Sequence, residues 1–237
     1  DGRLLALKPD VTLSIAKTAQ PAPGETLKYY YHENVYRPSA ESHTFQEISQ
    51  MGLEMLGAIG ETEVQQAVAL AAQSLEALGQ PWVLEVSHMG YLFGLFDALG
   101  VPEAARPGLL AALRAKNIHE LRAAAAAAGL DAAGADALTA LLDLSGDYAA
   151  VLPKAEALCQ NARLQAAAAE LRALAAPLAQ AGGTVRLDLT LAGEMEYYNG
   201  LVFQGYLRSL PRPLLKGGRY DLLMQKFTPG AGAIGFA

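Results

Sequence analysis

The sequence predicts an α+β domain in which strands at both ends of the chain enclose a long helical middle. Runs rich in Tyr, Val and Leu occupy the first 57 residues and the residues after 184. Between about residues 61 and 181, Ala and Leu recur at three- and four-residue spacing, which is typical of amphipathic helices. We therefore expect the 237 residues to form a single domain, with both ends contributing strands to one antiparallel sheet.

The N-terminal part predicts strands and one short helix. A strand over residues 4–7 precedes a helix over 11–17. The Tyr-rich run 27–37 and the alternating run 45–56 predict two antiparallel strands. The polar residues 38–43 between them predict an exposed loop.

The middle segment predicts a series of helices around one short apolar strand. Charged residues interrupt its Ala tracts, and the apolar periodicity favours packed helices over disorder. The expected helices cover residues 62–78, 89–99, 104–115, 117–128, 131–143 and 160–180, and the strand covers 82–87.

The C-terminal part returns to strands, expected over residues 184–191, 196–207 and 214–215 and again at the end of the chain. Gly217–Asp221 predicts a turn into a short helix. On a strand, the adjacent Tyr197 and Tyr198 face opposite sides of the sheet, so at most one of them should line a given pocket.

Composition excludes several classes of protein. Hydrophobic residues make up 52% of the chain and charged residues 18%, which excludes disorder. No run of about 18 apolar residues is free of charge, so no membrane helix is expected. The net charge of −6 argues against a dedicated nucleic-acid binder, whose affinity comes mainly from Lys and Arg. Because both ends fall within strand-like runs, we expect the chain to be a fragment.

Residue types that carry metal or redox chemistry are sparse. The single Cys159 excludes a disulfide framework and a cysteine zinc cluster, and it favours a cytoplasmic location. His32, His43, His88 and His119 lack metal-ligand spacing. A G-x-G-x-x-G run near the end lacks the βαβ unit of a dinucleotide site, so neither a metal nor a cofactor is expected.

Gln50 and Glu54 form the first candidate constellation. Their even spacing places both on one face of the predicted strand, whereas Glu47 faces the other way. An amide and a carboxylate together can accept an ammonium or an imidazole N–H, which suits a small polar ligand. The alternative is an ordinary solvated strand face.

Other polar residues each allow two interpretations. Asp10 and Thr12 can cap a helix or capture an amino group. Arg37, at the end of a strand, suits a phosphate, a carboxylate or a surface ion pair. Gly217 and Gly218 permit either an anion site at a helix start or a plain tight turn.

The order of these motifs resembles the catalytic core of histidyl-tRNA synthetases, which have the class II synthetase fold: an antiparallel sheet flanked by helices. The motifs are residues 8–12, 36–37, 45–54, 196–200 and 217–221, with 233–237 similar to the opening of the family's third motif.

The resemblance implies a pocket for histidine. Its residues would be Asp10, Thr12, Arg37, Gln50, Glu54, Tyr197, Tyr198 and Tyr220. By the family pattern, Asp10 and Thr12 hold the α-amino group, and Glu54 and Tyr198 reach the imidazole. Arg37 matches the arginine that contacts the α-phosphate of ATP and the amino-acid carboxylate.

Two departures from the family pattern indicate lost catalysis. Gly193 stands where synthetases carry an arginine, and losing such a group should cost about 3 kcal/mol of transition-state stabilisation. Arg37 is followed by Pro38, not by the usual glutamate. This pattern resembles the regulatory subunit of ATP phosphoribosyltransferase, a non-catalytic paralogue in histidine biosynthesis.

That second resemblance implies a histidine sensor that partners a short-form catalytic subunit, as a homodimer within a hetero-oligomer, and that binds no tRNA. Two alternatives stay open. One is an active histidyl-tRNA synthetase core that forms histidyl-adenylate. The other is a synthetase-like paralogue with a different amino-acid ligand or partner.

Overall fold

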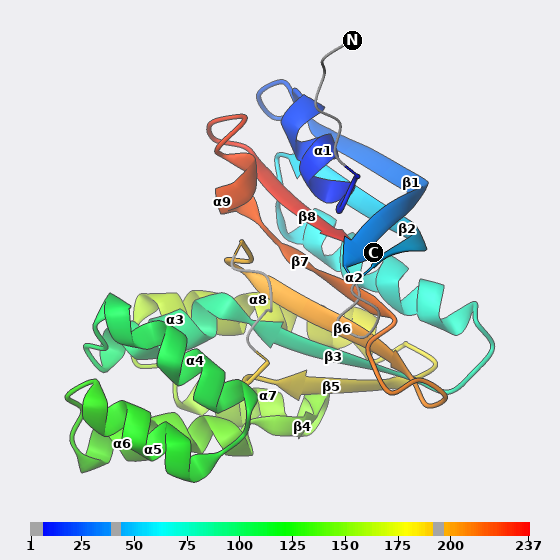
Figure 1. Cartoon of the computed structure of the whole chain (residues 1–237). Helices are drawn as coiled ribbons and strands as arrows, with labels where there is room; N and C mark the ends of the chain where they lie inside the picture. The colour runs from blue at the N-terminus through cyan, green and yellow to red at the C-terminus, as the bar shows by residue number, and fades with distance from the viewer. Residues whose placement is uncertain (1–6, 39–43, 192–196) are drawn as a thin grey trace.

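The structure, a computed structural model, describes residues 7–38, 44–191 and 197–237. Within those residues, eight strands form one sheet in the order β1-β2-β8-β7-β6-β3-β5-β4 (Figure 1). The strands are β1 (Thr26–Pro38), β2 (Phe45–Gly57), β3 (Trp82–His88), β4 (Ser145–Asp147), β5 (Thr184–Asp188), β6 (Leu201–Leu207), β7 (Leu215–Arg219) and β8 (Gly232–Phe236). Because β2 pairs with β8, the prediction that both ends of the chain share one sheet is confirmed.

The sheet is antiparallel except at one junction. β3 and β5 run parallel, from Val83 opposite Thr184 to Val86 opposite Leu187. A parallel pair needs a long crossover connection, and the helical middle segment supplies it. The α+β class is therefore correct, and the one parallel pair follows from the position of the helices in the chain.

Helices gather mainly at the β3–β5 end of the sheet, at the lower left of Figure 1. The described helices are α1 (Thr12–Thr18), α2 (Glu61–Glu76), α3 (Met89–Ala98), η1 (Glu103–Ala105), α4 (Arg106–Arg114), α5 (Ile118–Ala127), α6 (Ala132–Ala140), η2 (Leu141–Asp143), α7 (Tyr148–Ala157), α8 (Ala162–Leu178) and α9 (Asp221–Met224). None of the helices in the described part of the chain is long and apolar enough to cross a bilayer.

Most predicted helices are confirmed, but the sequence analysis missed α7 and the short strand β4. Pro153 lies inside α7 and interrupts the helical pattern. Gly146, with φ 158°, lies in β4 and masks its strand character. The Asp147 carboxylate accepts a hydrogen bond from the Ala150 amide and so caps α7.

Two predictions about the C-terminal strands are wrong. The strand expected over 196–207 begins only at Leu201, because the chain before it forms a turn. Gly217 and Gly218 lie inside β7, not in a turn, and the helix after them starts at Asp221. The predicted strand 4–7 and loop 38–43 fall largely outside the described residues.

The two faces of the sheet pack against different helices, because successive side chains of a strand point to opposite faces. On the face called here the back, Leu75 of α2 packs beside Gly205 of β6. On the opposite face, called the front, Leu56 of β2 and Ala233 of β8 pack with Ala16 of α1. The front face near β2 and β8 is thus enclosed by short N- and C-terminal segments.

Gly217 tests the close packing of the back face. A Cβ atom there would lie 2.5 Å from Phe236 Cβ and 2.6 Å from the Phe203 ring. We expect Gly217→Ala to lower the free energy of unfolding by about 1–3 kcal/mol. Gly108 of α4 has open space around it, so Gly108→Ala should be neutral or raise stability by about 0.5–1 kcal/mol. Urea denaturation checks both, and equal midpoints for the two variants would contradict the packing argument.

Candidate functional site

A buried carboxylate, Glu54 of β2, lies at the centre of the candidate site. Its side chain is 1% exposed on the front face. Thr12 Oγ1 donates a hydrogen bond to Glu54 Oε1 at 2.5 Å, and the Tyr220 hydroxyl donates to Oε2 at 2.5 Å. Three distant segments of the chain therefore meet at one carboxylate.

Glycines form the floor beside Glu54. In the strand register, Glu54 lies opposite Gly235 of β8, which in turn lies opposite Gly218 of β7. A Cβ atom on Gly235 would collide with the Glu54 carboxylate, and one on Gly218 would lie 2.8 Å from the Tyr198 ring. Only glycine at these two positions leaves room for the carboxylate and the ring.

Gln50 extends the site along β2 toward Arg37. Its Nε2 donates to the Tyr31 hydroxyl at 3.0 Å, and its Oε1 accepts from Arg37 Nη2 at 3.1 Å. The charge of Glu54 also contributes to the raised pKa of Tyr31. This is expected if Gln50 and Glu54 share a face. Glu47 points the other way and accepts from the Asn34 amide.

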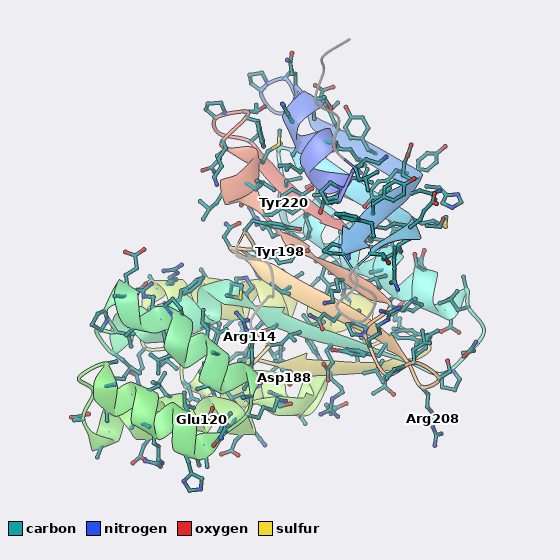
Figure 2. The ribbon with its side chains drawn as sticks, viewed as in Figure 1. Arg114, Glu120, Asp188, Tyr198, Arg208 and Tyr220 are labelled. Carbon is teal, nitrogen blue, oxygen red and sulfur yellow. The ribbon has the colours of Figure 1, made fainter. Side chains whose placement is uncertain are left out.

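Tyr197 and Tyr198 lie close to each other and to Tyr220. This differs from the prediction that at most one of the two adjacent tyrosines would line the pocket. The ring centroids of Tyr197 and Tyr198 are 4.7 Å apart, and those of Tyr197 and Tyr220 are 5.8 Å apart. The opposite-face rule fails because these residues precede β6 and do not lie on a strand. Figure 2 shows Tyr198 beside Tyr220, far from Glu120 of the helical segment.

Asp10 serves the helix and also lies close to the site. Its Oδ1 accepts a hydrogen bond from the Leu13 amide at 2.9 Å, which satisfies the first turn of α1. Its charge also contributes to the raised pKa values of Tyr31 and Tyr197. Capping and proximity to the pocket, the two interpretations of Asp10, are thus compatible.

Burial controls the charge of the site. It raises the pKa of Glu54 to about 7, although hydrogen bonds from Thr12 and Tyr220 oppose that rise. Burial also raises the pKa of Tyr31 to about 12 and those of Tyr197 and Tyr198 further. The tyrosines are therefore neutral hydroxyls at pH 7, arranged around a carboxylate that titrates near that pH.

Tyr31 was missed by the sequence analysis. Its hydroxyl joins Gln50, and its ring packs with Val11 and Val35. One signal could have found it: Tyr31 and Arg37 are separated by an even number of residues on one strand, so both face the same way.

Several expectations concern residues outside the described ranges or residues without a site role. Gly193, the position of the missing arginine, lies outside the described residues. Cys159 is half-buried, its Sγ donates to the Ala155 carbonyl oxygen, and burial raises the pKa of its thiol, all of which fit a packing role. Across the described ranges, no group of three or more His, Cys, Asp or Glu side chains could hold a metal.

The raised pKa of Glu54 makes stability depend on pH. The folded pKa of about 7 exceeds the ordinary value of 4.5, so the folded state holds an extra proton between these values. The stability from neutral Glu54 is present below about pH 4.5 and is lost as the pH rises through 7.

Relative to Glu54→Gln, the wild type should therefore lose roughly 3 kcal/mol of unfolding free energy between pH 4.5 and 8. Chemical denaturation across this range checks it, with the exposed Glu47→Gln as control. A constant difference between wild type and Glu54→Gln would contradict the assignment.

Comparisons with known proteins identify the fold family. A family model described as Histidyl-tRNA synthetase matches residues 1–237. The ATP phosphoribosyltransferase regulatory subunit of Symbiobacterium thermophilum is 33% identical over 246 residues, covering 100% of this chain and 60% of that protein. The chain thus spans about three fifths of this curated relative.

Solved structures of similarly described proteins have the same fold. A Bacillus halodurans protein described as an ATP phosphoribosyltransferase regulatory subunit/histidyl-tRNA synthetase superposes with a TM-score of 0.82 at 33% identity, over 97% of this chain and 61% of that one. A chain of the ATP phosphoribosyl transferase complex from Thermotoga maritima gives a TM-score of 0.76 at 20% identity, over 98% and 80%, and shows the fold alone. Because the family model matches the whole sequence, the chain belongs to the histidyl-tRNA synthetase family, which here includes ATP phosphoribosyltransferase regulatory subunits.

Proposed function

We propose that this chain is the histidine-sensing core of an ATP phosphoribosyltransferase regulatory subunit and performs no catalysis itself. The observation that carries the proposal is the buried Glu54 carboxylate, held between the hydroxyls of Thr12 and Tyr220. The relatives support the assembly, since the Symbiobacterium thermophilum protein and the Bacillus halodurans protein both carry that description.

The site chemistry suits histidine. Each carboxylate oxygen can accept more than one hydrogen bond, so Glu54 retains acceptor capacity for an imidazole N–H. The rings of Tyr197 and Tyr198 offer flat apolar surfaces for the imidazole. Asp10 and Gln50 would receive the α-ammonium group, and Arg37 the carboxylate.

The surroundings favour sensing over adenylation. A synthetase must stabilise negative charge that develops on ATP during attack by the amino acid, which requires cationic groups aimed at the phosphates. Arg37 hydrogen-bonds Gln50. Arg219, next to Tyr220 in the sequence, lies on the back of the sheet and bonds Asp221. By the resemblance to the family, Gly193 stands at the position of a further arginine that synthetases carry.

The proposed partner is the short-form catalytic subunit, joined by a homodimer of this chain within a hetero-oligomer. Histidine would report to the partner by binding two states of the assembly with different affinities. The description of the 33% identical Symbiobacterium thermophilum protein as an ATP phosphoribosyltransferase regulatory subunit supports such an assembly.

A histidyl-tRNA synthetase core is the second candidate. The description of the Bacillus halodurans structure, which names both functions, and the matching family model favour it. It differs from the first proposal in one chemical step, formation of histidyl-adenylate.

Histidine affinity tests the role of Glu54. Glu54→Gln preserves shape and removes charge, so calorimetry on the full-length protein should show about 10- to 100-fold weaker histidine binding. Glu47→Gln is the matched control, because Glu47 lies on the same strand and faces away from the site. Equal affinities for wild type and Glu54→Gln would remove Glu54 from the site.

Activation of the partner separates the two functions. Full-length protein should activate a short-form catalytic subunit, and histidine should inhibit that activity. ATP–pyrophosphate exchange with histidine should stay at background. Histidine-dependent exchange without activation of the partner would replace the regulatory proposal with the synthetase.

A further inference from the structure

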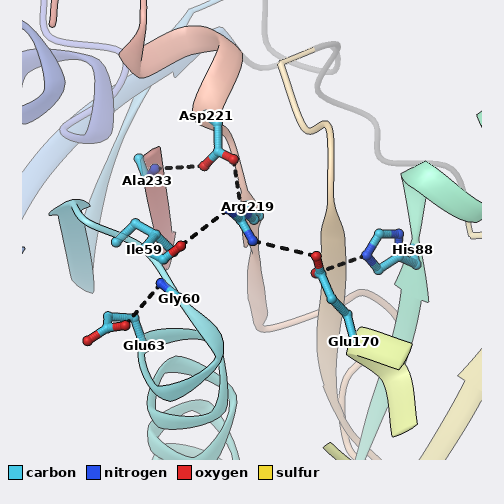
Figure 3. A network of polar contacts seen from close by, with 8 residues as sticks. All are labelled: Ile59, Gly60, Glu63, His88, Glu170, Arg219, Asp221 and Ala233. Carbon is cyan, nitrogen blue, oxygen red and sulfur yellow. Dashed lines mark hydrogen bonds and ion pairs between the residues drawn. The ribbon is translucent and has the colours of Figure 1, made fainter. Parts of the chain in front are cut away.

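Arg219 lies at the centre of a polar network on the back of the sheet (Figure 3). Its Nε donates to Asp221 Oδ2 at 2.8 Å, and its Nη2 donates to the Ile59 carbonyl oxygen at 3.3 Å. Asp221 Oδ1 in turn accepts from the Ala233 amide at 2.9 Å. The guanidinium therefore links the end of β7 to α9, to β8 and to the segment before α2.

Arg219 contacts both segments that carry tyrosines of the site, residues 197–200 and residues 219–221, which are called here the two tyrosine segments. Tyr220 follows it directly and reaches Glu54 on the opposite face. The Asn199 amide donates to the Arg219 carbonyl oxygen at 3.1 Å. The stem of Arg219 also lies against Gly200, where an added Cβ would be 3.0 Å from Arg219 Cδ. A shift of Arg219 would therefore move the residues next to Tyr198 and Tyr220.

Glu170 of α8 brings the helical segment into this network. Its Oε1 lies 3.6 Å from Arg219 Nη1, and its Oε2 lies 3.1 Å from His88 Nε2. His88 immediately precedes α3. The hydrogen bond with His88 and the charge of Arg219 lower the pKa of Glu170, so it is ionised at neutral pH.

The Glu170–Arg219 pair is suited to switching. It is long for an ion pair, and the Glu170 side chain is 39% exposed. Such partly solvated pairs form and break at little cost. When the pair opens, Arg219 keeps Asp221 and Ile59 as partners and Glu170 keeps His88, so opening frees Arg219 from α8 without leaving either charge alone.

We propose that Glu170 is a positioning residue that couples the helical segment to the front-face pocket through Arg219. The inference rests on the proposed function, in which that pocket senses histidine. Docking of the helical segment holds Arg219, and Arg219 holds the two tyrosine segments at their positions around Glu54. Because coupling is reciprocal, histidine in the pocket also favours the docked arrangement of α8.

Glu170→Gln tests the coupling, and Glu156→Gln is its matched control. Glu156 forms an ion pair with Arg172 in the same helical segment. Among the described residues, neither side chain of that pair hydrogen-bonds or ion-pairs with Arg219 or a residue of the pocket. In the full-length protein without ligand, we expect faster amide hydrogen exchange over residues 197–200 and 219–221 in Glu170→Gln, and wild-type exchange there in Glu156→Gln.

Histidine titration then tests reciprocity. Glu170→Gln should bind histidine about three- to tenfold more weakly than wild type. Histidine should slow exchange over α8 in wild type and in Glu156→Gln, but not in Glu170→Gln. A general loss of stability would not remove this ligand-dependent protection selectively.

Unchanged exchange and affinity in Glu170→Gln would overturn the proposal, as would equal effects of both variants. If wild type binds no histidine, the proposed function fails. The ligand-free exchange then still decides whether Glu170 positions the two tyrosine segments.

Discussion

The cost of burying one carboxylate organises this fold. An ionised side chain removed from water is unfavourable by several kcal/mol unless donors surround it. At Glu54, Thr12, 42 residues earlier, and Tyr220, 166 residues later, offset part of that cost. Both donors reach it only if α1 docks on the front face and β8 and β7 follow β2 in the sheet. The contacts of the site therefore form only when the strands take this order.

Glycine supplies the complementary constraint. The row that runs from Glu54 across β8 and β7 has glycine at both of the next positions, Gly235 and Gly218. Larger residues would occupy the space that the carboxylate and the Tyr198 ring now fill. The sheet thus has no apolar side chain at these two positions of its front face, whereas its back face packs against α2 and α8 in the main core.

The sequence predicted correctly those elements in which apolar and polar residues alternate regularly. The predictions failed where this alternation stops. Even spacing correctly placed Gln50 and Glu54 together, because β2 is a continuous strand. It misplaced Tyr197 and Tyr198, which lie in irregular chain just before β6. Burial of Glu54 and its bond to Tyr220 could not be predicted, since both depend on tertiary contacts between distant segments. Only the family resemblance brought these residues together beforehand.

In the proposed function, two adjacent residues at the end of β7 connect the pocket to the helices. Tyr220 faces the pocket, whereas Arg219 faces the helices, because successive side chains point to opposite sides. A single peptide unit therefore joins a residue of the pocket on the front face to a residue that contacts the helices on the back face. A synthetase uses binding energy to stabilise a transition state. In the proposed regulatory subunit, where Gly193 stands at the arginine position of the family pattern, the binding energy of histidine would instead shift the population of the states of the assembly.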